Sequence, residues 1–302
     1  MKKITPYILG VLLLVAAGCE TLDVITDLGT SIAVATGDLT EEEAASIKKS
    51  SSAMGKAFDR LTPEQEYYIG RAVAASILSS YKPYDAQAAN LYLNTIGQAL
   101  AMASDKPETF GGYHFLIMDT DEINAFSAPG GLILISRGML RCCKNETEVA
   151  AVLAHEIGHV ELEHGLRAIK KSRWTSAFTI LGAEAAKNLG SEELAELTKS
   201  FEGAITDVTS TMVNSGYARK LEQEADAAAI VIMKRVGYNP NGLRNMLREM
   251  GKLISHDDRG FAKTHPSPAD RIADISVELS AFGPVVPNAQ RTARFKKALG
   301  NI

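Results

Sequence analysis

Apolar residues recur every three or four positions along most of the chain, which is the period of a helix with one buried face. The pattern predicts helices over 62–78 and 86–103, and an almost continuous helical region after Asn145. Three starts are recognisable. Thr40 has Glu43 at capping-box spacing, Thr62 precedes a proline at the first helical position, and Asn145 is a capping residue with Glu148 three positions later. We therefore expect most of the chain to be helical.

A short region in the middle of the chain follows the pattern of β-strands instead. Three segments rich in apolar, β-branched and aromatic residues predict strands at 114–118, 123–126 and 132–135. The turn signal Ala-Pro-Gly-Gly at 128–131 separates the last two. The sequence therefore predicts an α+β fold that is mainly helical and carries a small β-sheet.

The N-terminal segment has the pattern of a targeting sequence. Two lysines precede the apolar run 8–15, which is too short to span a bilayer comfortably but suits the core of a signal peptide. Residues 15–19 (Val-Ala-Ala-Gly-Cys) resemble a bacterial lipobox, in which small residues precede a cysteine that is lipidated. We predict that residues 1–18 are a lipoprotein signal peptide and that a lipid on Cys19 anchors the chain to a membrane. A plain secretory signal with an incidental cysteine is the alternative.

The residues after this cysteine predict where the chain is held. Residues 19–39 are polar and predict a tether. Glu20, and not an aspartate, follows the cysteine, which by the sorting pattern of enteric bacteria favours the outer membrane. We expect a lipoprotein of the bacterial cell envelope that faces the periplasm and is held at the outer membrane.

Composition and charge are those of an ordinary globular protein. Of the 302 residues, 46% are hydrophobic and 23% are charged, so the chain can bury a large core. The net charge of -4 argues against nucleic acid as a partner, because phosphate binding needs a basic face. Cys142 and Cys143 are adjacent and pair only with strain, so we expect two free, buried thiols.

The most informative motif lies in the helical region after Asn145. His155 and His159 are four residues apart, so a helix places both imidazoles on one face, where they can bind one metal ion. Glu156 lies about 100° further around the helix, within reach of a water on that metal. The motif H-E-x-x-H is typical of zinc peptidases, whose catalytic zinc needs a third protein ligand and keeps one position for water.

An acidic pair on a later predicted helix can complete such a site. Glu222 and Asp226 are four residues apart and share a helix face. Glu222 could ligate the metal, and Asp226 could then accept the free ring N–H of a ligating histidine. In metzincins the third ligand is a histidine at the position held here by Gly165. His164 is out of helical phase with the first histidine, which predicts that it lies around the site or at the surface.

These motifs, together with others in the same order, resemble the M48 family of zinc metalloendopeptidases. The matching positions are Asp121 to Phe126 with Gly130-Gly131, His155-Glu156-x-x-His159, Arg219 with Glu222-x-x-Ala225-Asp226, and Thr264-His265-Pro266 with Arg271 to Asp274. Ala218 stands where many members have serine. The resemblance spans residues 62–279, and the lipobox together with the lack of a membrane hairpin is typical of the periplasmic members.

The resemblance implies the fold and the metal site. It implies a single zincin-like peptidase domain over 40–302, with its core at 62–282 and the small sheet flanking the active-site cleft. It implies one Zn²⁺ per chain, bound by His155, His159 and Glu222. Asp226 then orients these ligands or donates a proton.

The resemblance also implies how substrate is held. The edge strand at Asn124, Ala125 and Phe126 is expected to bind substrate by β-augmentation. This mode depends on the substrate backbone more than on its side chains, which suits unfolded clients. His265 lies in a loop near the metal, where it could block the open position, donate a hydrogen bond to the transition state or only pin the loop.

Hydrolysis of internal peptide bonds is the function that these residues predict. Zinc would activate a water, and Glu156 would take its proton and later deliver it to the leaving amine. We expect the substrates to be unfolded or misassembled envelope proteins. The alternatives are a chaperone or assembly factor with a closed, mainly structural zinc site, and an exopeptidase, for which the sequence shows no motif that captures a chain terminus.

Overall fold

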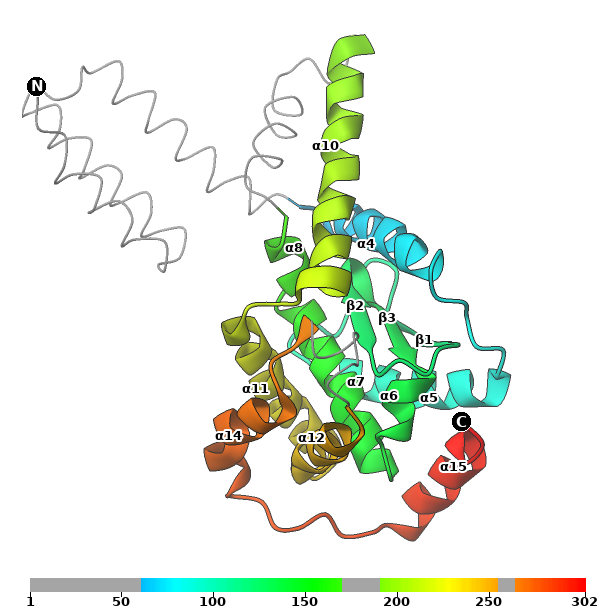
Figure 1. Ribbon diagram of the computed structural model, residues 1–302, viewed down its shortest axis with the longest axis vertical. Coiled ribbons are helices and arrows are strands. Elements are labelled where there is room, and N and C mark those ends of the chain that lie inside the picture. The colour runs from blue at the N-terminus through cyan, green and yellow to red at the C-terminus, as the bar shows by residue number, and fades with distance from the viewer. Residues whose placement is uncertain (1–60, 170–190, 255–263) are drawn as a thin grey trace, which may run out of the picture. The chain divides into compact units, whose positions relative to one another are not determined.

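The structure, a computed structural model, describes residues 61–169, 191–254 and 264–302, with the backbone alone for 191–200 (Figure 1). The predicted signal peptide, the lipidated Cys19 and the tether lie outside the described residues. Among the helices of the described ranges, none is both long enough and apolar enough to span a membrane.

Three short strands form the sheet. They are β1 (His114–Met118), β2 (Ala125–Ala128) and β3 (Leu132–Ser136), in the order β1-β3-β2. β3 runs parallel to β1 and antiparallel to β2, so β2 lies at an edge of this sheet. The number of strands confirms the prediction for this region.

The second strand begins two residues later than its pattern predicted. The carbonyl of Asn124 still accepts from the N–H of Ser136 at 3.0 Å, but its side-chain oxygen accepts a hydrogen bond from the N–H of Ala125 at 3.0 Å. Its own N–H donates to the hydroxyl of Ser136, also at 3.0 Å. The strand ladder therefore starts at Ala125 and continues to Ala128, up to the turn at Pro129.

Helices make up most of the described structure, as predicted for a mainly helical α+β fold (Figure 1). They are α4 (Pro63–Leu78), α5 (Gln87–Ala101), α6 (Arg137–Arg141), α7 (Glu146–Glu161), α8 (His164–Arg167), α10 (Ser191–Ser210), α11 (Arg219–Val236), α12 (Asn241–Leu253), α14 (Pro268–Leu279) and α15 (Ala289–Leu299). A single 3-10 turn, η1 (Pro129–Gly131), follows β2, and a π-helical turn, η3 (Thr211–Ser215), follows α10.

The predicted helix starts at Thr62 and Asn145 are confirmed, and the one at Thr40 lies outside the described residues. The hydroxyl of Thr62 accepts from the N–H of Gln65, whose side chain accepts in return from the N–H of Thr62, so α4 begins with a capping box. The side chain of Asn145 accepts from the N–H of Glu148 at 3.1 Å and so begins α7. Local hydrogen bonds therefore set where α7 starts, and with it the phase of the histidine motif.

Helix α7 is the centre of the fold. Every residue from Glu146 to Val160 is buried, and the helix contacts β2, α5, α11 and α12. Gly158 allows α11 to come close, because a Cβ at that position would lie 3.0 Å from the carbonyl oxygen of Ala225. In Figure 1 the sheet and α11 lie on different sides of α7, so the helix joins the two parts of the site.

The two adjacent cysteines follow α6 and are both buried and free, as predicted. Burial raises the pKa of Cys142 to about 12, and burial raises the pKa of Cys143 as well. The thiols therefore stay protonated at neutral pH and act as small apolar core residues.

Candidate metal centre

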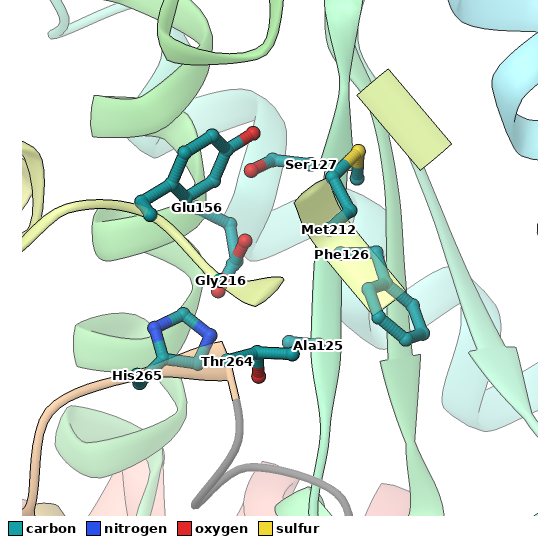
Figure 2. A pocket seen from close by; sticks show the side chains of 9 residues that line it. Ala125, Phe126, Ser127, Glu156, Met212, Gly216, Thr264 and His265 are labelled. Carbon is teal, nitrogen blue, oxygen red and sulfur yellow. The ribbon is translucent and has the colours of Figure 1, made fainter. Parts of the chain in front are cut away.

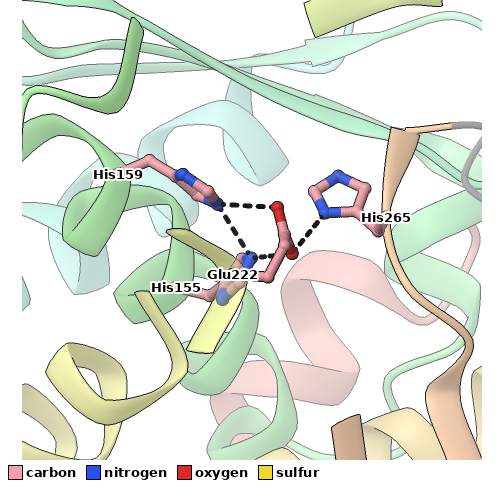
Figure 3. A group of neighbouring side chains, drawn as sticks. All are labelled: His155, His159, Glu222 and His265. Carbon is pink, nitrogen blue, oxygen red and sulfur yellow. Dashed lines mark hydrogen bonds and ion pairs between the residues drawn. The ribbon is translucent and has the colours of Figure 1, made fainter. Parts of the chain in front are cut away.

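Two helices bring three of the predicted ligands together (Figure 3). His155 and His159 project from α7 with their Nε2 atoms 3.2 Å apart. Glu222 comes from the first turn of α11, with Oε2 3.5 Å from Nε2 of His155 and Oε1 3.4 Å from Nε2 of His159. All three side chains are buried. The close packing of α7 on α11 thus joins residues far apart in the sequence.

A third histidine lies in the same group. Nδ1 of His265 lies 2.7 Å from Oε2 of Glu222. One ligand atom from each of the four side chains, His155, His159, Glu222 and His265, lies within 4.8 Å of the others. Figure 3 shows the imidazole of His265 on the side of Glu222 that faces away from His159.

Charge in this group is concentrated on Glu222. Burial opposes its negative charge, but His265 and the two α7 histidines hold its pKa well below the usual range. Burial also opposes a proton on His155, yet Asp226 and Glu222 raise its pKa to about 9. Burial lowers the pKa of His159, against the effect of Glu222. Glu222 is therefore held in its charged form, and His155 favours its charged form as well.

A carboxylate and a guanidinium support the outer side of His155. Oδ1 of Asp226 lies 2.9 Å from Nδ1 of His155. Arg271, from α14, donates from Nε to Oδ2 of Asp226 at 2.9 Å, and its Nη2 lies 3.1 Å from the same histidine nitrogen. Burial opposes the charge on Asp226, but Arg271 and His155 lower its pKa to about 2. The structure thus places Asp226 against the ring nitrogen that faces away from Glu222.

Arg271 is a residue of the site whose burial the sequence did not predict. The sequence pointed to it only as one position of a motif that resembles the family. It is 2% exposed, although arginine is rarely buried without partners. In the sequence of α14 it stands at an ordinary polar position, so the pattern gave no sign that its side chain is buried. A buried arginine that contacts Asp226 could be recognised only once α14 had been placed on α11.

His164 lies against the cluster rather than at the surface. Its Nδ1 is 2.8 Å from Nδ1 of His159, and its Nε2 is 3.2 Å from Oε2 of Glu224. Burial, followed by the effect of His159, lowers its pKa to about 4. Helical phase cannot be extended to this residue, because α7 ends at Glu161 and Glu163 adopts a left-handed conformation with φ of 56°. Of the two places that the sequence left open, it occupies the surroundings of the site.

A small pocket opens beside the cluster (Figure 2). Glu156, which is 3% exposed, lies on its wall, as does His265. The lining residues come from β2, α7, η3 and the residues after it, and the segment before α14. They are Ala125, Phe126, Ser127, Glu156, Met212, Gly216, Tyr217, Thr264 and His265. Of the three predicted substrate-binding residues, Ala125 and Phe126 line the pocket, whereas Asn124 is buried and bonded within the sheet.

Tyr217 forms a further part of the wall that the sequence did not single out. Its ring stacks on His159 with centroids 4.5 Å apart and an interplanar angle of 22°. Burial, with Glu156 and Glu222 nearby, raises the pKa of its hydroxyl above the usual value. A lone tyrosine in a region that the sequence predicts to be mostly helical carries no sequence signal for this role.

Gly216 sets the position of this tyrosine. It has a φ of +71°, which favours glycine, and a Cβ there would lie only 2.0 Å from the carbonyl oxygen of Thr264. The absence of a side chain thus lets the segment before α11 touch the segment that carries His265. Two chain segments of the pocket wall depend on this one close approach.

Comparison with known proteins identifies the family of this fold and site. Residues 87–279, well over half of the chain, match the sequence profile of Peptidase family M48. The chain is 29% identical over 214 residues to the beta-barrel assembly-enhancing protease of Escherichia coli (strain K12), which covers 68% of this chain and 42% of the relative.

Two other relatives have the same level of identity. The chain is 29% identical over 206 residues to the mitochondrial metalloendopeptidase OMA1 of Schizosaccharomyces pombe, covering 66% of this chain and 54% of the relative. It is 29% identical over 162 residues to the metalloprotease LoiP of Escherichia coli (strain K12), covering 54% of this chain and 61% of the relative. The aligned region thus spans about half the length of each relative.

Proposed function

The chain belongs to Peptidase family M48, a family of metalloendopeptidases, and we propose that it is a zinc-dependent endopeptidase of the bacterial cell envelope that cleaves unfolded or misassembled proteins. The observation that carries the proposal is the group of four ligand atoms within 4.8 Å, with Glu156 on the wall of the adjoining pocket. Membership of the family implies a divalent metal ion, and the residues present can be tested against it.

The side chains of the cluster fit zinc. Imidazole nitrogens and a carboxylate oxygen are ligands that zinc takes in catalytic sites. Oε1 of Glu222 is buried and accepts no hydrogen bond from the described residues, so this oxygen is available as a ligand for a metal ion. The Nε2 atoms of His155 and His159 face each other and the same carboxylate, as ligands of one ion do.

His155, His159 and Glu222 hold the ion in this proposal, one Zn²⁺ per chain. Bound there, zinc supplies a Lewis acid that lowers the pKa of water and polarises a carbonyl. Glu156 takes the proton of the attacking water on its carboxylate and delivers it to the nitrogen of the leaving amine. Its place on the pocket wall beside the ligands supports this role over a closed, structural site.

Asp226 and His265 have supporting roles in this proposal. Asp226 accepts the Nδ1–H of His155 and so holds the ring with Nε2 toward the metal, an assignment supported by the 2.9 Å contact. His265 would supply a further ligand nitrogen, supported by its 2.7 Å contact with Glu222, and a substrate would have to displace it. His265→Ala then raises the turnover of short peptides, whereas a lower turnover would favour donation to the transition state.

Substrate lies along β2 in this proposal. β2 is an edge of the sheet, and Ala125 and Phe126 line the pocket beside Glu156. An extended peptide can pair with the free edge through its backbone, with Asn124 at the start of the strand helping to hold it. Backbone pairing does not depend on one side-chain sequence, which suits unfolded clients.

The lipid anchor is the part of the proposal that rests on the N-terminal sequence. Residues 1–18 are removed, a lipid on Cys19 holds the chain at the outer membrane, and the peptidase domain over 40–302 faces the periplasm. The name of the relative from Escherichia coli, which refers to β-barrel assembly, supports this placement. Cys19→Ser moves the protein from the membrane fraction to the soluble fraction of bacterial cells; retention at the membrane contradicts the anchor.

The decisive experiment measures zinc content and cleavage of casein for the chain from Glu20 onward. We expect about one zinc per chain and cleavage that a chelator stops. Glu156→Gln retains the zinc and loses cleavage, because the ligands are unchanged while the base is gone. Equal turnover by wild type and Glu156→Gln contradicts the peptidase and favours the chaperone with a structural zinc site. Cleavage of an end-blocked peptide excludes the exopeptidase.

A further inference from the structure

We propose that Ser127 and Tyr217 form a polar subsite beside the metal cluster, which selects a substrate with serine or threonine next to the scissile bond. The inference rests on the proposed peptidase function and names a substrate class for that site. Two hydroxyl groups on the wall of one pocket carry it, because both are buried and accept or donate no hydrogen bond among the described residues.

Ser127 presents the first of these hydroxyls from the edge strand. Its side chain is 4% exposed, and it lies on β2 directly after Phe126. A buried hydroxyl normally has a hydrogen-bond partner, because leaving it without one is unfavourable. Other buried serines of the described chain follow this rule: Ser136 accepts from the N–H of Met139, and Ser104 donates to the carbonyl of Ala101.

Tyr217 presents the second hydroxyl from the segment between η3 and α11. Stacking on His159 fixes its ring, and the close approach of Gly216 to Thr264 fixes the backbone before it. The hydroxyl oxygen is buried, although part of the ring is accessible. The other buried tyrosines offer a contrast, since the hydroxyls of Tyr92 and Tyr238 both donate to Glu146.

The rest of the pocket limits what can enter. Phe126 and Met212 supply apolar walls, and Glu156 is the one acidic side chain among the described lining residues (Figure 2). The enclosed space is about 10 Å³, which is room for roughly one water-sized group. A hydroxyl on a short side chain therefore fits, and a long side chain does not.

The chemistry of the two hydroxyls selects the kind of side chain. Each can donate one hydrogen bond and accept others, so the matching group should also donate and accept. A carboxylate is disfavoured beside Glu156, and an aliphatic side chain leaves both protein hydroxyls unpaired. A hydroxyl on a two- or three-carbon side chain meets the requirement, which points to serine or threonine. Sites that bond a substrate hydroxyl reject analogues that lack it.

Matched peptides test the subsite directly. Threonine and valine have nearly the same shape and differ by a hydroxyl in place of a methyl group. Peptides that differ only by Thr or Val on either side of the cleaved bond are compared by kcat/KM with the zinc-loaded protein. We expect wild type to prefer threonine by about tenfold or more at one of the two positions. Ser127→Ala and Tyr217→Phe each reduce that ratio toward one.

Two variants control for general damage. Ser104→Ala and Tyr92→Phe remove a hydroxyl from a buried serine and a buried tyrosine outside the pocket, and both keep the wild-type ratio. Zinc content and thermal unfolding confirm that each variant is folded. A uniform loss of turnover in Tyr217→Phe, with the ratio unchanged, overturns the subsite.

A binding measurement separates this proposal from the peptidase function itself. Glu156→Gln is titrated with the labelled threonine and valine peptides, and fluorescence anisotropy reports their affinities without turnover. Tighter binding of the threonine peptide, lost on adding Ser127→Ala, supports the subsite even where no protein is cleaved. Equal affinities together with a wild-type kcat/KM ratio near one overturn it.

Discussion

Glu146 and Glu222 are two buried carboxylates, each 1% exposed, that face very different surroundings. Glu146 begins α7 and accepts hydrogen bonds from Tyr92 at 3.2 Å and Tyr238 at 2.8 Å. Arg294, from α15, donates to both of its oxygens. Every oxygen of Glu146 is thus used within the protein, and the C-terminal helix is held against the start of the central one.

Glu222 lies at the other end of the same core with a different set of neighbours. It faces three imidazole rings, and its Oε1 accepts no hydrogen bond from the described residues. A buried charge whose partners are complete contributes to stability, whereas one that keeps an acceptor beside other ligand atoms is suited to bind something. Burial of an acidic residue therefore does not by itself mark a functional site; the remaining bonding capacity does.

The largest expected effect comes from removing the charge of Glu222. Glu222→Gln should weaken zinc binding by more than about 100-fold, because changes to groups that only support a ligand already cost 10- to 100-fold. Peptidase activity is lost with the metal. Elemental analysis after dialysis measures the zinc, and the matched variant Glu146→Gln keeps it. Stoichiometric zinc in Glu222→Gln removes this residue from the ligands.

The matched change at Glu146 should affect stability instead. Glu146→Gln replaces a charged acceptor by an amide, so the donors from Tyr92, Tyr238 and Arg294 are no longer all paired. We expect a loss of about 2–4 kcal/mol in the free energy of unfolding, measured in urea. Zinc content and the activity of the folded fraction stay unchanged. A loss of zinc at full folding would show that the two carboxylates are not separate in function.

A smaller effect is expected at the carboxylate behind His155. Asp226→Asn keeps the shape but removes the charge that faces Nδ1 of His155 and Arg271. We expect zinc affinity to fall by about 10- to 100-fold, less than for Glu222→Gln. Competition with a chelating dye measures the affinity of both variants side by side. An affinity equal to that of wild type contradicts the orienting role of Asp226.

The smallest effect concerns how the free energy of unfolding depends on pH through Tyr238, which donates a hydrogen bond to Glu146. Burial, and then the hydrogen bond to Glu146, raise the pKa of Tyr238 to about 12. Because unfolded tyrosine has a pKa of about 10, this stabilisation is complete below about pH 10 and is lost as the pH rises through about 12. Urea unfolding across this window should show a smaller decline for Tyr238→Phe than for wild type. An equal decline of the free energy of unfolding in both proteins contradicts this contribution of Tyr238.

Local patterns in the sequence were enough for α7 and the histidines on it. The Asn145 cap and the four-residue spacing of His155 and His159 act within a few positions, so the helix and its face follow from nearest neighbours. The α+β class and the three strands followed in the same way. The start of β2 could not be predicted in this way, because the N–H of Asn124 donates to the side chain of Ser136 and not to a backbone carbonyl.

Other parts of the site depend on contacts between distant segments. Arg271 looks like an ordinary polar position of α14, and Tyr217 carries no signal in the sequence, until α11 and α14 are packed together. His164 follows a left-handed residue, Glu163, so helical phase could not place it. The unpaired hydroxyl of Ser127 is a property of its final surroundings and has no counterpart in the sequence.

The sequence by itself determined the helices, the strands and the residue types that can bind a metal, since these depend on short-range periodicity and side-chain chemistry. The tertiary structure alone decided which of those residues meet and which bonds they leave unused. The physical reason is that a buried polar group is satisfied or left free by neighbours that come from anywhere in the chain. Gly158 and Gly216 permit two of the close approaches that bring those neighbours together.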